Sequence, residues 1–209
     1  AALIVCGTFA LNTIPAEPET GMRIAALQTA EIDDRSLTQK QTEAAAKGAE
    51  LTVWPEFSGI AMVSQGDTSQ LIQLAKGTAP FVTTFNDVHD PLPHNVAAVF
   101  TKGGQSEPYN KRKLFGGEKK MHTAGKSAVA VPIGGETVGL NICFDSCFPS
   151  VMHETAALPG VSIIALPTID PPSKHYFVAG MHAAFTPFRA AELGLPIVRA
   201  DGYAFSMIV

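Results

Sequence analysis

Short apolar runs alternate along this chain with segments of helical periodicity, and this alternation constrains the fold more than any other feature. Residues 161–166 (VSIIAL) are almost entirely apolar, as expected of a strand that is covered on both faces. Strands that alternate with helices in this way form layered α/β folds, in which helices cover the sheets. We therefore predict an α/β fold.

The predicted elements follow one another in nearly regular order. Apolar runs bounded by turn residues predict strands over 22–28, 51–54, 81–85, 96–101, 128–133, 138–142, 161–166, 197–200 and 205–209. Helical periodicity predicts helices over 36–48, 70–76, 150–158 and 182–193. We expect Pro187 to break the last helix, because proline removes a backbone donor.

One domain accounts for most of the chain. A length of 209 residues with 46% hydrophobic and 16% charged side chains suits a single substantial core, which we place over residues 22–209. Residues 1–21 form an apolar segment and linker, too short to span a bilayer alone. We interpret this segment as the end of a membrane helix or, alternatively, as a buried strand or helix.

Charge and motif content exclude several classes of function. The net charge of −4 gives no reason to expect nucleic acid as a partner. Cys6, Cys143 and Cys147 are spaced neither as a zinc site nor as a disulfide framework, so at least one thiol is free. The six histidines have no ligand-like spacing, and we predict no metal site. Serine-hydrolase, zinc-protease and dinucleotide motifs are missing from the sequence.

Three segments place a reactive side chain just after an apolar strand, where α/β folds gather their sites. Glu56 ends LTVWPE, Lys111 lies in YNKRKLFGGE, and Cys143 lies in GLNICFD. Singly, each has a simpler interpretation as a solvated carboxylate, a surface cation or a small buried hydrophobe. Together they supply a thiol nucleophile, a base to deprotonate it, and a cation for the oxyanion formed by attack on a carbonyl.

The order of WPE, Y-x-K-x-x-L with FGGE, and ICFD-x-x-FP resembles the Glu–Lys–Cys signature of the carbon–nitrogen hydrolase (nitrilase) superfamily, from Met22 to Val209. The resemblance implies a nitrilase-like α-β-β-α sandwich, a covalent thioester and no metal or organic cofactor. It implies Glu56 as general base, Lys111 as electrophilic partner and Cys143 as nucleophile. The partners it implies are an acyl donor and an amine or water acceptor.

Within the superfamily, several segments most resemble the catalytic domain of apolipoprotein N-acyltransferases, which move an acyl chain from a phospholipid to the N-terminal amine of a lipoprotein. The FGGE run implies Glu118 as a second active-site carboxylate, with an ion pair to Lys119 or Lys120 as the alternative. Arg189 and Glu192, three apart on a predicted helix, are expected to form a structural ion pair.

Two departures keep other functions open. Asp145 stands where that branch carries glutamate, and the chain ends in the run 205–209, short of the branch's usual end, as a truncated domain would. A soluble amidase or nitrilase that hydrolyses a non-peptide carbon–nitrogen bond is the first alternative, and an inactive nitrilase-fold interaction domain is the second. Acyl transfer predicts membrane association at an extracytoplasmic face, whereas the amidase alternative predicts a cytoplasmic enzyme and a homodimer.

Three further side chains receive structural interpretations. Cys147 is expected in a pocket wall, with a redox pair to Cys143 as the alternative. His182 is expected to pack rather than react, and Trp54 to anchor the core.

Overall fold

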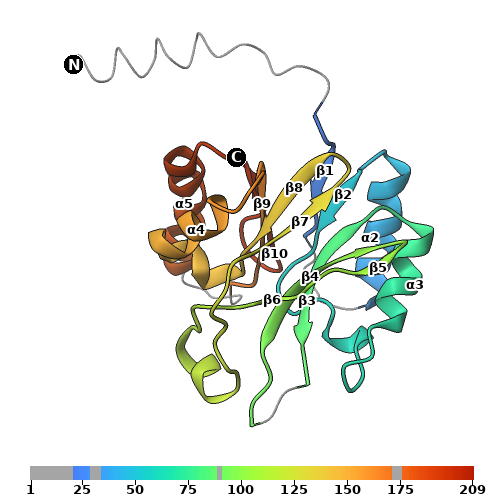
Figure 1. Ribbon diagram of the computed structural model, residues 1–209, viewed down its shortest axis with the longest axis horizontal. Coiled ribbons are helices and arrows are strands. Elements are labelled where there is room, and N and C mark those ends of the chain that lie inside the picture. Colours follow the sequence, from blue (N-terminus) through green and yellow to red (C-terminus); the bar gives the residue numbers. More distant parts are fainter. Residues whose placement is uncertain (1–20, 29–33, 89–90, 171–175) are drawn as a thin grey trace.

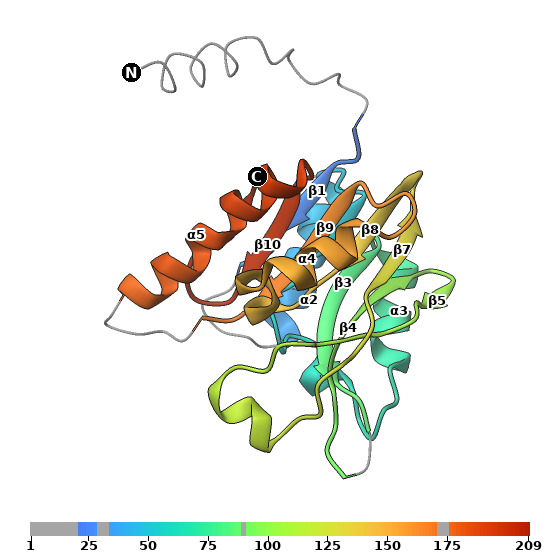
Figure 2. The same cartoon turned by 60° about the vertical axis from the view of Figure 1, so that its left-hand side comes forward.

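Two β-sheets lie face to face at the centre of the protein, and helices cover their outer faces (Figures 1 and 2). This is a computed structural model, which describes residues 21–28, 34–88, 91–170 and 176–209. The predicted α-β-β-α sandwich is confirmed. The apolar segment predicted over residues 1–21 lies outside the described residues except for Gly21.

The first sheet carries the amino-terminal half of the fold. Its strands run in the order β1 (Ile24–Ala26), β2 (Leu51–Val53), β3 (Phe81–Asn86), β4 (Asn95–Thr101) and β5 (Gly104–Gln105), with β6 (Tyr109–Asn110) also paired to β4. Strands β1 to β3 are parallel, and the remaining pairs are antiparallel. Helices α2 (Asp34–Ala46) and α3 (Ser69–Gly77) pack on its outer face.

The second sheet carries the carboxyl-terminal half. Its order is β11 (Met207–Ile208), β10 (Ile197–Asp201), β9 (Ile163–Thr168), β8 (Glu136–Leu140) and β7 (Val129–Ile133). The central strands β8, β9 and β10 are parallel, and both edge strands are antiparallel. Helices α4 (Pro149–Ala156) and α5 (Tyr176–Leu193) cover it (Figure 2). Short 3-10 helices form η1 (Ile60–Met62), η2 (Gly116–Lys120) and η3 (Cys143–Cys147).

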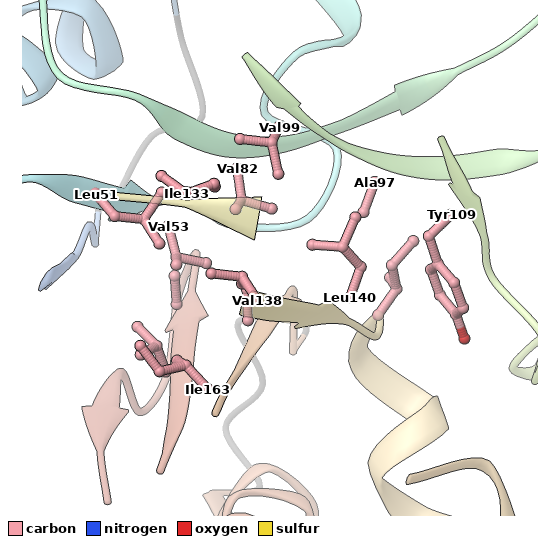
Figure 3. Packing of buried hydrophobic residues seen from close by; sticks show 14 of the residues in the cluster. Leu51, Val53, Val82, Ala97, Val99, Tyr109, Ile133, Val138, Leu140 and Ile163 are labelled. Carbon is pink, nitrogen blue, oxygen red and sulfur yellow. The ribbon is translucent and has the colours of Figure 1, made fainter. Parts of the chain in front are cut away.

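Side chains from both sheets fill the space between them (Figure 3). Val53 and Val82 of the first sheet meet Val138 and Leu140 of the second, and all four are fully buried. Burial of a side chain of this size stabilises the fold by about 1.5–3 kcal/mol. This central core fixes the sheets against each other and thereby sets the distances between residues at their ends.

Side chains at alternating positions from β2 to the residue after it, Trp54, face the outer helices instead of the space between the sheets. Trp54 is fully buried, its ring stacks on Phe81 with centroids 4.7 Å apart, and its Nε1 donates to Gln41 Oε1 of α2 at 2.9 Å. The predicted role of Trp54 as a core anchor is confirmed.

The largest correction to the predicted elements concerns α5. The helix begins at Tyr176 and continues through Pro187 to Leu193 without the predicted break. A proline removes one backbone hydrogen bond from a helix, but packing on the second sheet and α4 holds the remaining turns together. The other predicted helices and all predicted strands are present, with ends displaced by a few residues. Among the described helices, none has the length and apolar character needed to cross a membrane.

Candidate active site

The three predicted catalytic residues come together near the ends of strands from both sheets. Glu56 follows β2, Lys111 follows β6 and Cys143 begins η3 after β8. Their exposed fractions are only 1%, 1% and 7%, so the site is shielded from water. Low exposure strengthens the electrostatic interactions among these groups.

The turn after β2 positions Glu56 between the sheets. Its backbone N–H donates to Thr168 O at the end of β9, at 3.1 Å, which joins the two sheets at this point. Phe57 then adopts a positive φ of 61°, and its N–H bonds Thr84 Oγ1. A left-handed backbone is costly for phenylalanine, so the surrounding contacts must hold this turn in place.

Lys111 joins two carboxylates. Its Nζ lies 2.8 Å from Glu56 Oε1 and 2.9 and 2.8 Å from the two carboxylate oxygens of Glu118, which lies in η2. Asn95 Nδ2 donates to Glu56 Oε1 at 2.8 Å and to Glu118 Oε1 at 3.2 Å. Glu118 therefore lies where the resemblance implied, and it pairs with Lys111 rather than forming the alternative surface pair. Asn95 was missed, and its only sequence signal is a polar residue at the start of an apolar strand.

The charges of this cluster do not cancel. Among the described residues it holds the two carboxylates of Glu56 and Glu118 against the single ammonium of Lys111. Burial alone would lower the pKa of Lys111, but the two carboxylates and the neighbouring thiol outweigh burial and raise it. Lys111 is therefore a permanent cation, suited to stabilise negative charge and unsuited to act as a base.

Gly125 packs closely against the backbone of the segment that carries Lys111. Its N–H donates to Lys111 O at 2.9 Å, and a Cβ at this position would lie 2.2 Å from Asn110 O. No side chain fits there without moving the backbone that carries Lys111.

Cys143 lies at a sharp turn between β8 and η3. Its φ of 46° is unusual for a residue with a side chain and marks a backbone held by its surroundings. Burial first, and the charge of Glu56 second, raise the pKa of its thiol well above the usual value, while Lys111 opposes them. The resting thiol is therefore neutral at neutral pH, and attack requires a base to take its proton.

Asp145 connects the cysteine turn to the lysine segment. Its Oδ2 accepts from Ile142 N at 2.9 Å and from Tyr109 Oη at 2.7 Å, and its Oδ1 accepts from Lys113 N at 2.8 Å. Burial raises the pKa of Asp145, whereas these hydrogen bonds lower it. Its identity was noted in the sequence as a departure from one branch, but its connecting position was not predicted.

A second buried cluster supports the turn from the other side. Asp170 bonds His182 Nδ1 at 2.7 Å and Arg199 at 2.7 Å, and Arg199 also bonds Asp201 at 2.8 Å. His182 Nε2 lies 3.3 Å from Cys143 O. Burial would lower the pKa of His182, but the bond to Asp170 outweighs it and raises the pKa to about 9. As predicted, His182 is packed into the fold rather than placed to react, and it also hydrogen-bonds the backbone of the Cys143 turn.

Asp170, Arg199 and Asp201 were missed in the sequence. The signal available was the pair Arg199 and Asp201, which places two charges on one face of the otherwise apolar strand 197–201.

A cavity of about 240 Å³ lies beside Cys143, between η3 and the first turns of α5. Cys147 lines it, which confirms the predicted wall position, and both Cys143 and Cys147 are free thiols. Arg189 and Glu192 form the expected ion pair on α5. Within the described ranges, no group of three or more histidine, cysteine or carboxylate side chains is arranged to hold a metal ion.

The comparisons with known proteins agree on the family. The family model described as Carbon-nitrogen hydrolase matches residues 23–209, so the chain belongs to the carbon–nitrogen hydrolase family of enzymes. A search of curated protein sequences found no significant match.

Solved structures of an amidase from the bacterium Nesterenkonia share the fold. A cysteine-to-alanine mutant of the Nesterenkonia AN1 amidase, from the nitrilase superfamily, superposes with a TM-score of 0.75 at 22% identity, over 93% of this chain and 85% of that chain. A mutant that shows Michael addition of acrylamide at the active-site cysteine gives 0.73 at 23% identity, over 90% and 85%. A mutant in complex with butyramide gives 0.74 at 21% identity, over 92% and 84%. The predicted resemblance to apolipoprotein N-acyltransferases is not shown by these comparisons.

Proposed function

We propose that the protein is an amidase that hydrolyses a non-peptide carbon–nitrogen bond through a thioester on Cys143. The observation that carries the proposal is the buried contact of Lys111 with Glu56 and Glu118, next to a neutral thiol. This arrangement supplies a base, a fixed cation and a nucleophile in one water-poor site, which are the groups that acyl transfer requires.

The first half-reaction forms the thioester. Glu56 takes the proton of the Cys143 thiol as the sulfur attacks the carbonyl carbon, and the carbonyl electron pair moves onto oxygen. Lys111 stabilises this oxyanion. When the oxyanion collapses, the carbon–nitrogen bond breaks, and Glu56 returns the proton to the leaving nitrogen, which departs as ammonia or an amine.

The second half-reaction releases the acid. Water gives a proton to Glu56 and attacks the thioester carbonyl, and Lys111 again stabilises the oxyanion. Collapse breaks the carbon–sulfur bond, the thiolate regains the proton from Glu56, and the carboxylic acid leaves. Asn95 and Glu118 are positioning residues, because their hydrogen bonds hold the side chains of Glu56 and Lys111 in place during both half-reactions.

The likeness to the Nesterenkonia amidase supports water rather than a lipoprotein amine as acceptor. Convergence of the three side chains in one buried site also argues against the inactive-domain alternative. For this amidase we retain the prediction of a cytoplasmic enzyme, with a homodimer as its expected assembly.

Phospholipid-dependent acyl transfer is the second candidate. It is favoured by the apolar side chains that lie exposed along the first turns of α5, beside the cavity: Phe177 at 75%, Val178 at 58% and Met181 at 52% exposure. An acyl chain delivered from a membrane would meet such a surface. This candidate retains the predicted extracytoplasmic membrane location.

Intact-mass spectrometry and ammonia release distinguish the two candidates. The wild-type protein, Cys143→Ala and the control Cys147→Ala are incubated with butyramide and, separately, with phospholipid vesicles. We expect ammonia release from butyramide by wild type and by Cys147→Ala, and none by Cys143→Ala. A fatty-acyl adduct formed only with vesicles, without amide turnover, would favour acyl transfer instead.

A further inference from the structure

The cavity beside Cys143 is lined mainly by apolar side chains. Its lining includes Phe144 next to the nucleophile, Ile169 after β9, Phe115 before η2, and Val178, Met181 and Phe185 of α5. The rings of Phe115 and Phe144 pack edge to face with centroids 5.0 Å apart. A second edge contact, with Phe148 at a centroid distance of 5.2 Å, holds the Phe144 ring in place beside the cysteine turn.

The ionisable groups that line the cavity, apart from its two cysteines, already have partners. Asp170 is bonded by His182 and Arg199, and His182 Nε2 lies 3.3 Å from both Cys143 O and Ser146 Oγ. Within the described part of the chain these groups are therefore engaged with the protein. A polar substrate group placed against these walls would lose part of its water without gaining a partner, which is unfavourable.

The direction of attack decides which part of the substrate occupies this cavity. In the tetrahedral intermediate, the carbon carries the Cys143 sulfur, an oxyanion, a nitrogen and the acyl substituent. The oxyanion must face Lys111, and the nitrogen must face Glu56, which protonates it. Both groups belong to the charged cluster, so the acyl substituent takes the remaining direction, toward Phe144 and Phe185.

We infer that the substrate is an amide whose acyl group is apolar, an aliphatic chain or an aromatic ring, and that this group lies against Phe144 and Phe185 when Cys143 attacks. This inference rests on the proposed function, because it assigns the acyl half of the amide that Cys143 attacks. Phe185 is then a specificity-determining residue.

The primary test compares kcat/KM for acetamide, butyramide, hexanamide and glutaramate, a chain of similar length that ends in a carboxylate. We expect about a fourfold rise for each added methylene until the cavity is filled. Glutaramate should be at least about tenfold poorer than hexanamide, because its charge would lose water without compensation. Acetamide or glutaramate hydrolysed as well as hexanamide would overturn the inference and leave the amidase proposal intact.

Two phenylalanines of α5 provide matched variants. Phe185 lines the cavity, whereas Phe188, three residues further along the helix, is 71% exposed and lies outside the lining. Phe185→Ala should lower kcat/KM for hexanamide about tenfold and change that for acetamide little. Phe188→Ala should leave both unchanged. Equal losses for the two amides in Phe185→Ala would show a structural effect and count against a role in specificity.

A binding experiment separates failure of the inference from failure of the proposed function. The full-length Cys143→Ala protein is heated with each of the four compounds, and the shift in Tm is measured. If no amide is hydrolysed by wild type but hexanamide stabilises Cys143→Ala more than acetamide and glutaramate do, the amidase proposal fails and the apolar site stands. Equal shifts with all four compounds would overturn the apolar site.

Discussion

Two buried charge clusters flank Cys143, and they differ in how their charges balance. On the side of the first sheet, Glu56 and Glu118 share the single ammonium of Lys111, which leaves one negative charge in excess. A buried excess charge is unfavourable for folding, so its presence marks a place where chemistry rather than stability sets the residues.

On the side of the second sheet the charges cancel. Asp170 and Asp201 face Arg199 and a His182 that the bond to Asp170 keeps protonated near neutral pH. A balanced and hydrogen-bonded cluster can hold a backbone turn firmly without offering a free base. The comparison teaches that one cluster has a carboxylate available to accept a proton, whereas the other fixes the position of the nucleophile.

Removing the cation of the unbalanced cluster should have the largest effect. Lys111→Met leaves the largely buried carboxylates of Glu56 and Glu118 without an opposite charge, and we expect a loss of about 3–5 kcal/mol in the free energy of unfolding together with loss of amide hydrolysis. Urea unfolding and ammonia release measure the two effects. The control is Lys119→Met, an exposed residue of η2. Similar stability for the two variants would contradict the assigned role of Lys111.

Neutralising each carboxylate separately tests which one is the base. Glu56→Gln keeps an acceptor for Lys111 but cannot take a proton, and we expect kcat to fall about 10²- to 10⁴-fold. Glu118→Gln should lower kcat much less, because Glu118 acts through Lys111. Steady-state hydrolysis of butyramide by the two variants measures the difference. If Glu118→Gln proved the more damaging change, the two roles would have to be exchanged.

The balanced cluster should reveal itself in the pH dependence of stability. The pKa of His182 in the folded protein is raised to about 9, above its usual value of 6.5. Its bond to Asp170 therefore contributes fully below about pH 6.5, and this contribution is lost as the pH rises through about 9. This shift in pKa corresponds to a contribution of about 3 kcal/mol to the free energy of unfolding.

His182→Gln provides the measurement. The difference in free energy of unfolding between wild type and His182→Gln should be largest near pH 6 and should shrink by pH 9.5, as followed by urea unfolding. A difference that does not change with pH would show that His182 contributes by packing alone.

The smallest effect is expected at the second thiol. Cys147 lines the cavity but lies apart from the Glu56–Lys111 pair, so Cys147→Ala should change stability by less than about 1 kcal/mol and leave hydrolysis of butyramide nearly unchanged. Urea unfolding and ammonia release from butyramide by Cys147→Ala and wild type check the two expectations. Loss of turnover in Cys147→Ala would show that the nucleophile had been misassigned.

Much of the fold and the main site residues could be predicted because their signals are local. Apolar runs and turn residues located the strands, and Glu56 and Cys143 each follow such a run. Lys111 instead follows the two-residue strand β6, which was not predicted, and its motif rather than an apolar run identified it. Pro187 gave the wrong prediction for a related reason. Its local effect is to break a helix, whereas the packing of α5 on the second sheet and α4 overrides that effect.

The supporting residues could not be predicted, because their roles depend on contacts between distant segments. Asn95 lies 39 residues from Glu56 along the chain, and Arg199 lies 29 from Asp170. Neither pair has a spacing that a helix or strand would reveal.

The sequence by itself determined the α/β architecture and the three reactive residue types, because hydrophobic periodicity and strand ends are local properties of a chain. Only the tertiary structure decided which charges meet. The packing of Val53 and Val82 against Val138 and Leu140 fixes the position of one sheet relative to the other. This arrangement leaves the Glu56 cluster with an excess negative charge and the Asp170 cluster neutral. The charge balance of a buried cluster depends on distances in space rather than on order along the chain.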